Sequence, residues 1–263
     1  MNWLTCLLDF TARAGALQAQ DDHGPALLGG VTPYELLEQG LHLLGLELHD
    51  ERQTPRKGRG KARGTRELED CTAQLWHQTA AEIRTVRQAL GIPVHCTILS
   101  SGDVVLLHPL RAYLWHAGAG NKFTIGVEVS CRAAGIEGDA RTFWRSKREI
   151  KRGDTYAELV REATDVQLAA GVLVGAYYCA EVKRQRLLAR MVGAGLVACL
   201  LHRNTAKSRV SDPGSRIALG VAKPVAEAHG LEYGGPVVGS GHETPAAWGG
   251  APRVPYSWRV RGY

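Results

Sequence analysis

Apolar residues near the start of this 263-residue chain recur at the spacing of amphipathic helices. Residues 3–10 place Trp3, Leu4, Leu7 and Leu8 at positions that suit a first helix. Residues 32–48 predict a second helix, which begins with a threonine N-cap and a proline at its first position. We therefore expect residues 1–50 to form an N-terminal helical extension.

From residue 70 onward, short apolar segments alternate with helical ones. Residues 80–90 predict a helix that Gly91-Ile92-Pro93 ends, and residues 100–103 predict a hairpin turn between two strands. This alternation is typical of an α/β fold with a central mixed β-sheet flanked by helices. The segments that predict strands are 71–76, 94–99, 104–107, 123–129 and 191–201.

The second half of the chain contains one long helical pattern between two less regular stretches. Residues 132–163 are polar and predict an irregular surface insertion. Thr164 and Gln167 then form a capping box that opens one long helix or two, as far as residue 188. A short helix over 215–228 follows. We divide the chain into the extension, a basic linker over 51–66, a main domain over 67–228 and a Gly/Pro-rich tail over 229–263.

The basic linker changes the picture of possible partners. The formal net charge is +6, and residues 52–66 hold seven basic residues and no acidic one. Three glycines favour a flexible, solvated segment, and no aromatic side chain is interleaved for base stacking. We therefore regard nucleic-acid binding as the weaker interpretation and contact with an anionic wall polymer as the better one.

Membrane insertion and disulfide formation find little support in the sequence. No run of about 18 apolar residues could span a bilayer. Residues 1–10 lack an early basic residue, and Asp9 interrupts their apolar part, so we expect no cleaved signal peptide and synthesis in the cytoplasm. Six cysteines without C-x-x-C spacing suit free thiols in a reducing compartment.

Candidate chemistry gathers at the ends of the predicted strands. His77, His95 and His202 lie at such positions, and a polar loop after His202 ends on Asp212-Pro213-Gly214. Two histidines and one aspartate supply the three protein ligands of a catalytic zinc site, which keeps one position open for water. The alternative is that these histidines have ordinary core or surface roles, because no short H-E-x-x-H motif is present.

Glu128 is the candidate proton carrier for such a site. It interrupts the apolar segment Thr-Ile-Gly-Val-Glu-Val, where a buried carboxylate is costly unless it is paired or functional. Its alternative is a position at a sheet edge that faces water.

Five motifs occur in an order that is similar to a known family. They are residues 75–80 (Leu-Trp-His-Gln-Thr-Ala), 94–98 (Val-His-Cys-Thr-Ile), 115–118 (Trp-His-Ala-Gly), 121–129 and 202–214. Together they resemble the zinc-dependent N-acetylmuramoyl-L-alanine amidases, a family that includes phage lysozyme-type amidases and peptidoglycan recognition proteins. The resemblance covers roughly residues 65–225. It implies a mixed sheet with zinc at one edge, and cleavage of the amide between the lactyl group of N-acetylmuramic acid and L-alanine.

The resemblance also implies roles for individual residues. Zinc would be held by His77, His202 and Asp212. Glu128 falls at the position of the acidic catalytic residue. His116 falls in the loop that lines the substrate groove, and Asn121 would fix that loop.

One position departs from the family pattern. Many members have a lysine two residues before the third ligand, where it stabilises the oxyanion, and this chain has Val210 there. Arg209 or Lys207 could reach the same place. The resemblance thus implies an endolysin-like hydrolase or a recycling enzyme that acts on peptidoglycan or muropeptides. The alternative is a member that binds peptidoglycan without cleaving it.

Overall fold

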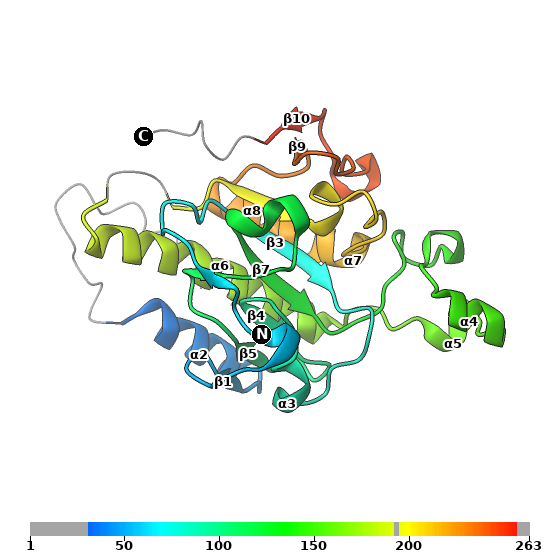
Figure 1. Ribbon diagram of the computed structural model, residues 1–263, viewed down its shortest axis with the longest axis horizontal. Coiled ribbons are helices and arrows are strands. Elements are labelled where there is room, and N and C mark those ends of the chain that lie inside the picture. Colours follow the sequence, from blue (N-terminus) through cyan, green and yellow to red (C-terminus); the bar gives the residue numbers. More distant parts are fainter. Residues whose placement is uncertain (1–30, 192–194, 257–263) are drawn as a thin grey trace.

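A six-stranded mixed sheet forms the centre of the protein in a computed structural model that describes residues 31–191 and 195–256 (Figure 1). The strand order is β1-β5-β4-β7-β3-β8, and only the β4–β5 pair is antiparallel. This confirms the predicted fold class and the hairpin. The strands are β1 (Leu48–Asp50), β3 (Ala73–Gln78), β4 (Cys96–Ile98), β5 (Val104–Leu106), β7 (Thr124–Val129) and β8 (Ala198–Leu201).

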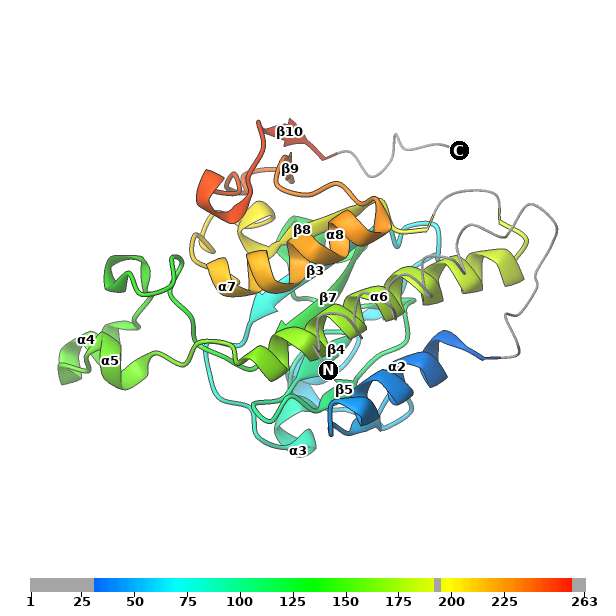
Figure 2. The same ribbon diagram turned by 180° about the vertical axis from the view of Figure 1, so that it is seen from behind.

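Three of the described helices cover one face of this sheet, as Figure 2 shows. Helices α2 (Pro33–Leu43), α6 (Asp165–Leu188) and α8 (Lys223–His229) share one apolar core with alternate strand residues such as Trp76 and Val127. α8 continues α7 (Ser215–Ile217) and the π-helical turn Ala218–Ala222. The Thr164–Gln167 capping box opens α6 as predicted, and α6 is a single helix.

The opposite face of the sheet carries the strand positions of the candidate site. Because side chains alternate along a strand, His77 of β3 lies on the face opposite Trp76. Smaller apolar clusters, around Leu75 and Phe123 and around Val105 and Leu107, occupy this face beside α3 (Val86–Ala89) and the connecting loops. The face that lacks long helices is therefore the one on which the candidate site can open.

The N-terminal region differs from its prediction in one respect. The first predicted helix lies outside the described residues. The second begins on its Thr32 cap as predicted but ends at Leu43, and residues 48–50 form β1 instead. β1 pairs with β5, which lies more than fifty residues later in the chain, so local helical spacing could not reveal it.

The predicted helix over 80–90 is wrong for its first half. Ala80 has a left-handed backbone (φ 53°), and the amide of Ile83 donates to the hydroxyl of Ser130. Both features divert the chain from a helix until the Thr85–Gln88 capping box opens the four-residue α3.

The basic segment is more ordered than a solvated linker. It contains the 3-10 turn Gly58–Gly60 and β2 (Gly64–Thr65), which pairs with β6 (Ala112–Tyr113). Arg66 is only 6% exposed and donates hydrogen bonds to the carbonyls of Leu110 and Thr124. These carbonyls solvate its charge inside the protein.

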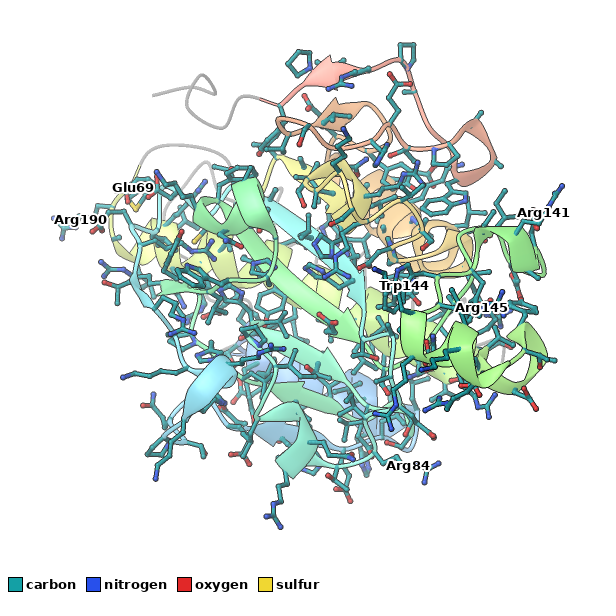
Figure 3. The ribbon with its side chains drawn as sticks, turned by 45° about the vertical axis from the view of Figure 1, so that its right-hand side comes forward. Glu69, Arg84, Arg141, Trp144, Arg145 and Arg190 are labelled. Atoms are coloured by element: carbon teal, nitrogen blue, oxygen red, sulfur yellow. The ribbon has the colours of Figure 1, made fainter. Side chains whose placement is uncertain are left out.

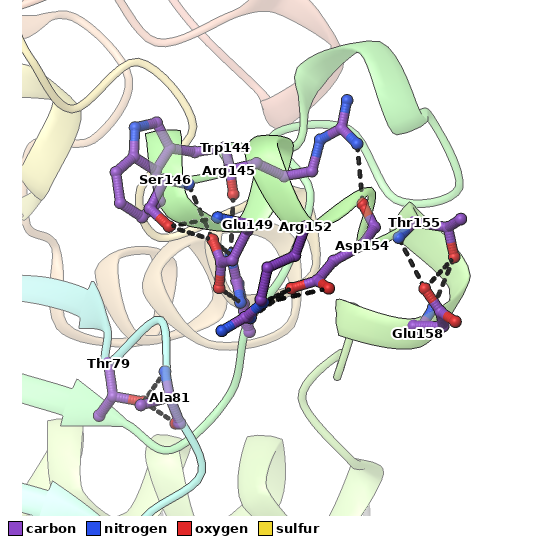
Figure 4. Close-up of polar contacts among 11 residues, drawn as sticks. Thr79, Ala81, Trp144, Arg145, Ser146, Glu149, Arg152, Asp154, Thr155 and Glu158 are labelled. Atoms are coloured by element: carbon purple, nitrogen blue, oxygen red, sulfur yellow. Dashed lines mark hydrogen bonds and ion pairs between the residues drawn. The ribbon is translucent and has the colours of Figure 1, made fainter.

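Residues 132–163 project from the body as an arm (Figure 1). The arm contains the 3-10 turn Ala140–Thr142 and two short helices, α4 (Lys147–Arg152) and α5 (Tyr156–Leu159), so it is less irregular than predicted. Capping boxes at Ser146 and Thr155 open these helices (Figure 4). Arg132 forms a two-point ion pair with Glu149. The arm is therefore held by its own polar contacts.

The Gly/Pro-rich C-terminal segment packs against the residues that follow β8. It contains β9 (Pro236–Val237), the 3-10 turn Ala246–Trp248 and β10 (Val254–Pro255). Asn204 donates from its side-chain amide to the carbonyl of His242 and the hydroxyl of Thr244. The C-terminal segment thus supports the loop after β8. None of the helices in the described ranges is long and apolar enough to cross a membrane.

Candidate metal centre and active site

Two adjacent parallel strands bring the two predicted histidine ligands together. β3 and β8 are in register, with Trp76 opposite Leu201, so the next residues, His77 and His202, emerge side by side. Their Nδ1 atoms lie 2.8 Å apart, and both side chains are buried. His202 begins the 3-10 turn His202–Asn204, which turns the chain into the polar loop.

That loop returns the carboxylate of Asp212 to the same point. Asp212 Oδ2 lies 2.8 Å from His202 Nδ1, and its other oxygen accepts a hydrogen bond from the backbone amide of Gln78. One nitrogen or oxygen from each of His77, His202 and Asp212 lies within 4.8 Å of the others. We call these three side chains the ligand triad.

The donor set of the ligand triad suits zinc. Imidazole nitrogens and a carboxylate oxygen are its usual ligands, and imidazole must be uncharged to bind a metal. Burial, together with the nearby His202, His116 and Arg209, holds the pKa of His77 well below its usual range. His77 is therefore neutral at physiological pH, as a ligand must be.

His116 lies directly behind His77. Its Nδ1 is 2.9 Å from Nε2 of His77, and its own Nε2 is 3.3 Å from the hydroxyl of Thr124, which donates to the carbonyl of Gly120. If His77 uses Nδ1 for a metal, its Nε2 carries the proton and His116 accepts it. Burial and the charge of Arg66 lower the pKa of His116 to about 3, which keeps it able to accept.

Asn121 fixes the backbone that carries His116. Its side-chain oxygen accepts hydrogen bonds from the amides of His116 and Ala117, at 2.9 and 2.6 Å. The ring of His116 packs against Gly126, where any Cβ atom would lie 2.5 Å from its Nδ1. The loop held by Asn121 and the strand at Gly126 together therefore fix the position of the His116 ring.

Glu128 is aligned with the ligand triad across the sheet. In the β3–β7 register it lies opposite His77, so both side chains are on the same face. Burial and the carboxylate of Asp212 hold its pKa well above the usual range, while the charge of Arg209 acts in the opposite direction. A carboxyl group with this environment is suited to proton transfer near neutral pH.

The two candidate cations differ in their relation to the site. The side chain of Arg209 is exposed, and its charge acts on both His77 and Glu128. Lys207 is also exposed. Its backbone carbonyl accepts a hydrogen bond from His242. Val210 is also exposed, so its side chain does not cover the loop between Lys207 and Arg209.

Several residues that support the site were not singled out from the sequence. Gln78 donates to the carbonyl of Ser211 and accepts from the amide of Ala133, so it joins the loop of Asp212 to the base of the arm. Arg203 donates to the carbonyls of Val210 and Glu243. Gln78 and Arg203 each directly follow a predicted ligand, which is the one signal that could have revealed them.

Two solved structures that align with much of this chain can be named. One is the endolysin N-acetylmuramoyl-L-alanine amidase LysCS from Clostridium intestinale, with a TM-score of 0.39 and 12% identity over 71% of this chain and 97% of that one. The other is Drosophila peptidoglycan recognition protein SD, with a TM-score of 0.37 and 13% identity over 72% and 98%. No curated protein sequence matches the chain.

A family profile matches the sequence itself. It describes N-acetylmuramoyl-L-alanine amidases and matches residues 62–215, which is more than half of the chain. The matched segment contains the ligand triad, His116 and Glu128. The chain therefore belongs to the N-acetylmuramoyl-L-alanine amidase family.

Proposed function

We propose that this protein hydrolyses the amide bond between N-acetylmuramic acid and L-alanine in peptidoglycan or its soluble fragments, with zinc as its cofactor. The observation that carries the proposal is the convergence of His77, His202 and Asp212 within 4.8 Å, with Glu128 in register beside His77. When bound, zinc would polarise the substrate carbonyl and lower the pKa of a water molecule.

The residues of the chain would do the remaining work. The ligand triad would hold the ion, with His77 oriented through His116 and Asp212 through the amide of Gln78. Glu128 would accept a proton from the attacking water and deliver it to the departing alanine nitrogen. Its raised pKa favours the first of these transfers, because a carboxylate with a higher pKa is a stronger base.

Oxyanion stabilisation is assigned to Arg209. A cation near the reacting carbonyl stabilises the negative charge that develops in the transition state. Arg209 fits this role better than Lys207 because its charge already acts on His77 and Glu128. A flexible arginine can therefore take the place of the lysine that many family members have at the position of Val210.

The decisive experiment combines metal analysis with product analysis. Purified protein is expected to contain about one zinc per chain and to release peptides with free L-alanine amino termini from peptidoglycan. Glu128→Gln should keep the zinc and lose the turnover, because the amide cannot carry the proton. Turnover by Glu128→Gln at the wild-type rate would contradict the role of Glu128.

The second candidate function is peptidoglycan binding without turnover. The absence of a lysine at Val210 favours it, because one missing oxyanion donor lowers the rate by about 10²–10³. Binding of muropeptides by a zinc-loaded protein that releases no new amino termini would decide for this function. The place of action depends on which kind of hydrolase the protein is. An endolysin would act on the wall after release, and a recycling enzyme would act on fragments in the cytoplasm.

A further inference from the structure

A pocket of about 470 Å³ lies beside the loop that carries Asp212. One side is formed by residues 135–144 of the arm, and a second by Arg203, Val210 and Ser211. Pro245 and Trp248 of the C-terminal segment form the third. Ser211 immediately precedes Asp212 and Arg203 immediately follows His202, so two lining residues are chain neighbours of the ligand triad.

The pocket is not part of the sheet that forms the ligand triad. The arm supplies Phe143 and Trp144, while Pro245 and Trp248 lie beyond the residues that the family profile matches. The three segments are nevertheless fixed to one another. Gln78 joins Ser211 to Ala133, and Arg203 joins Val210 to Glu243. The pocket is therefore built by the folded chain itself.

Trp144 offers a flat apolar surface inside this pocket. Its side chain is 61% exposed, and Figure 3 shows it on the side of the arm that faces the body of the protein. The backbone beneath it is held in place, because its carbonyl accepts from Arg132 and Ser146 caps α4 two residues later (Figure 4). When a ligand covers a large apolar side chain on a fixed backbone, the removal of that apolar surface from water favours binding.

The charged groups of the pocket are already engaged by the protein. Arg141 forms two hydrogen bonds with Asp139, at 2.9 and 2.8 Å. The guanidinium of Arg203 binds backbone carbonyls and lies over the ring of Trp248, 4.8 Å from its centroid. These pairings partly satisfy both cations, so the pocket can also hold a neutral ligand.

A neutral ring with one apolar face and a polar edge meets these conditions. In a pyranose the C–H groups form such a face, while hydroxyl and acetamido groups form the edge. The face can stack on the indole of Trp144, and the polar edge can lie toward Ser211, which lines the same pocket. The volume of the pocket is within the range of small-ligand sites.

We infer that this pocket is a saccharide subsite that binds an N-acetylated pyranose ring of the glycan, with Trp144 as its stacking platform. The inference rests on the proposed function, in that peptidoglycan is taken as the substrate. It adds to that function by placing the sugar on the arm side of the ligand triad, which leaves the peptide for the opposite side.

The test is calorimetric titration of the zinc-loaded, full-length protein with two probes. One probe is the disaccharide of N-acetylglucosamine and N-acetylmuramic acid with its lactyl carboxyl group blocked as a methylamide, so that it is neutral like the substrate, and the other is the stem tetrapeptide without a sugar. Trp144→Ala should weaken disaccharide binding by about tenfold, as the loss of an aromatic stacking contact does, and leave tetrapeptide binding unchanged. Trp144→Phe should restore most of the affinity.

Ile150→Ala is the matched control. Ile150 is an exposed apolar residue of the same arm (57%) that does not line the pocket, so disaccharide binding should stay at the wild-type value. Equal disaccharide affinity in wild type and Trp144→Ala would overturn the inference. Weaker tetrapeptide binding with unchanged disaccharide binding would overturn it as well, because the pocket would then hold the peptide.

The outcomes separate this inference from the proposed hydrolysis. Disaccharide binding that depends on Trp144, in a protein that releases no amino termini, would support the subsite and reject the hydrolase. Hydrolysis with the same kcat/KM in wild type and Trp144→Ala would support the hydrolase and reject the subsite.

Discussion

The Nε2 atom of His77 lies 2.9 Å from Nδ1 of His116, so the buried proposed ligand is hydrogen-bonded to a second histidine from a different loop. The contact continues through the hydroxyl of Thr124 to the carbonyl of Gly120. Such a chain fixes the tautomer and the orientation of a ligand before any metal binds. His116 would therefore act on the proposed metal centre through His77.

Replacing His116 should weaken zinc binding without removing a ligand. We expect His116→Ala to raise the Kd for zinc by about 10- to 100-fold, because His77 loses the partner that orients its ring. Competition with a chromophoric chelator measures this Kd. The melting temperature of the metal-free protein serves as the control for folding. An unchanged Kd in a folded variant would show that His77 needs no such partner.

Gly126 provides an independent route to the same contact. An added Cβ would lie 2.5 Å from Nδ1 of His116 and would displace the ring from His77. We expect Gly126→Ala to weaken zinc binding in the same direction as His116→Ala, and the double variant to be little worse than either single one. Gly91→Ala is the matched control, since its Cβ would meet its nearest neighbour at an ordinary 3.5 Å.

The two cations of the polar loop should differ in their effect on turnover. Arg209→Ala is expected to lower kcat by about 10²–10³, because a donor to the developing oxyanion is lost, while zinc content stays the same. Lys207→Ala should change kcat by less than about threefold, since within residues 31–191 and 195–256 no contact ties its ammonium group to the site. Steady-state release of amino termini from muropeptides measures both. A larger loss in Lys207→Ala would reverse the assignment.

Much of the site could be predicted from the sequence because its residues stand at fixed places on strands. His77 and Glu128 belong to apolar segments whose alternation is visible in the sequence, and their alignment follows from the parallel pairing of β3 and β7. His202 ends an apolar segment in the same way. The convergence of His77, His202 and Asp212 therefore follows from strand ends that share one edge of the sheet.

The parts that could not be predicted depend on contacts between distant segments. β1 exists because Leu48 to Asp50 pair with Val104 to Leu106, and nothing near residue 48 signals this. Arg66 looked like part of a solvated basic segment, but carbonyls more than forty residues away bury it. The bond from His116 to His77 joins residues 39 positions apart, which sequence spacing cannot show.

Acid should destabilise the protein through His108, which is 7% exposed. Burial and the charge of Arg56 lower its pKa to about 4, although the carbonyl of Gly60 acts in the opposite direction. Because this pKa lies below the unfolded value of about 6.5, the stability contributed by neutral His108 is fully present above pH 6.5 and is lost as the pH falls toward 4. Between pH 7 and pH 5 this loss amounts to about 2 kcal/mol of unfolding free energy.

Urea unfolding of wild type and His108→Gln at both pH values isolates the contribution of His108, since the other buried histidines titrate in both proteins. The variant should lose about 2 kcal/mol less than wild type on acidification; equal losses would mean that His108 titrates at its ordinary pKa.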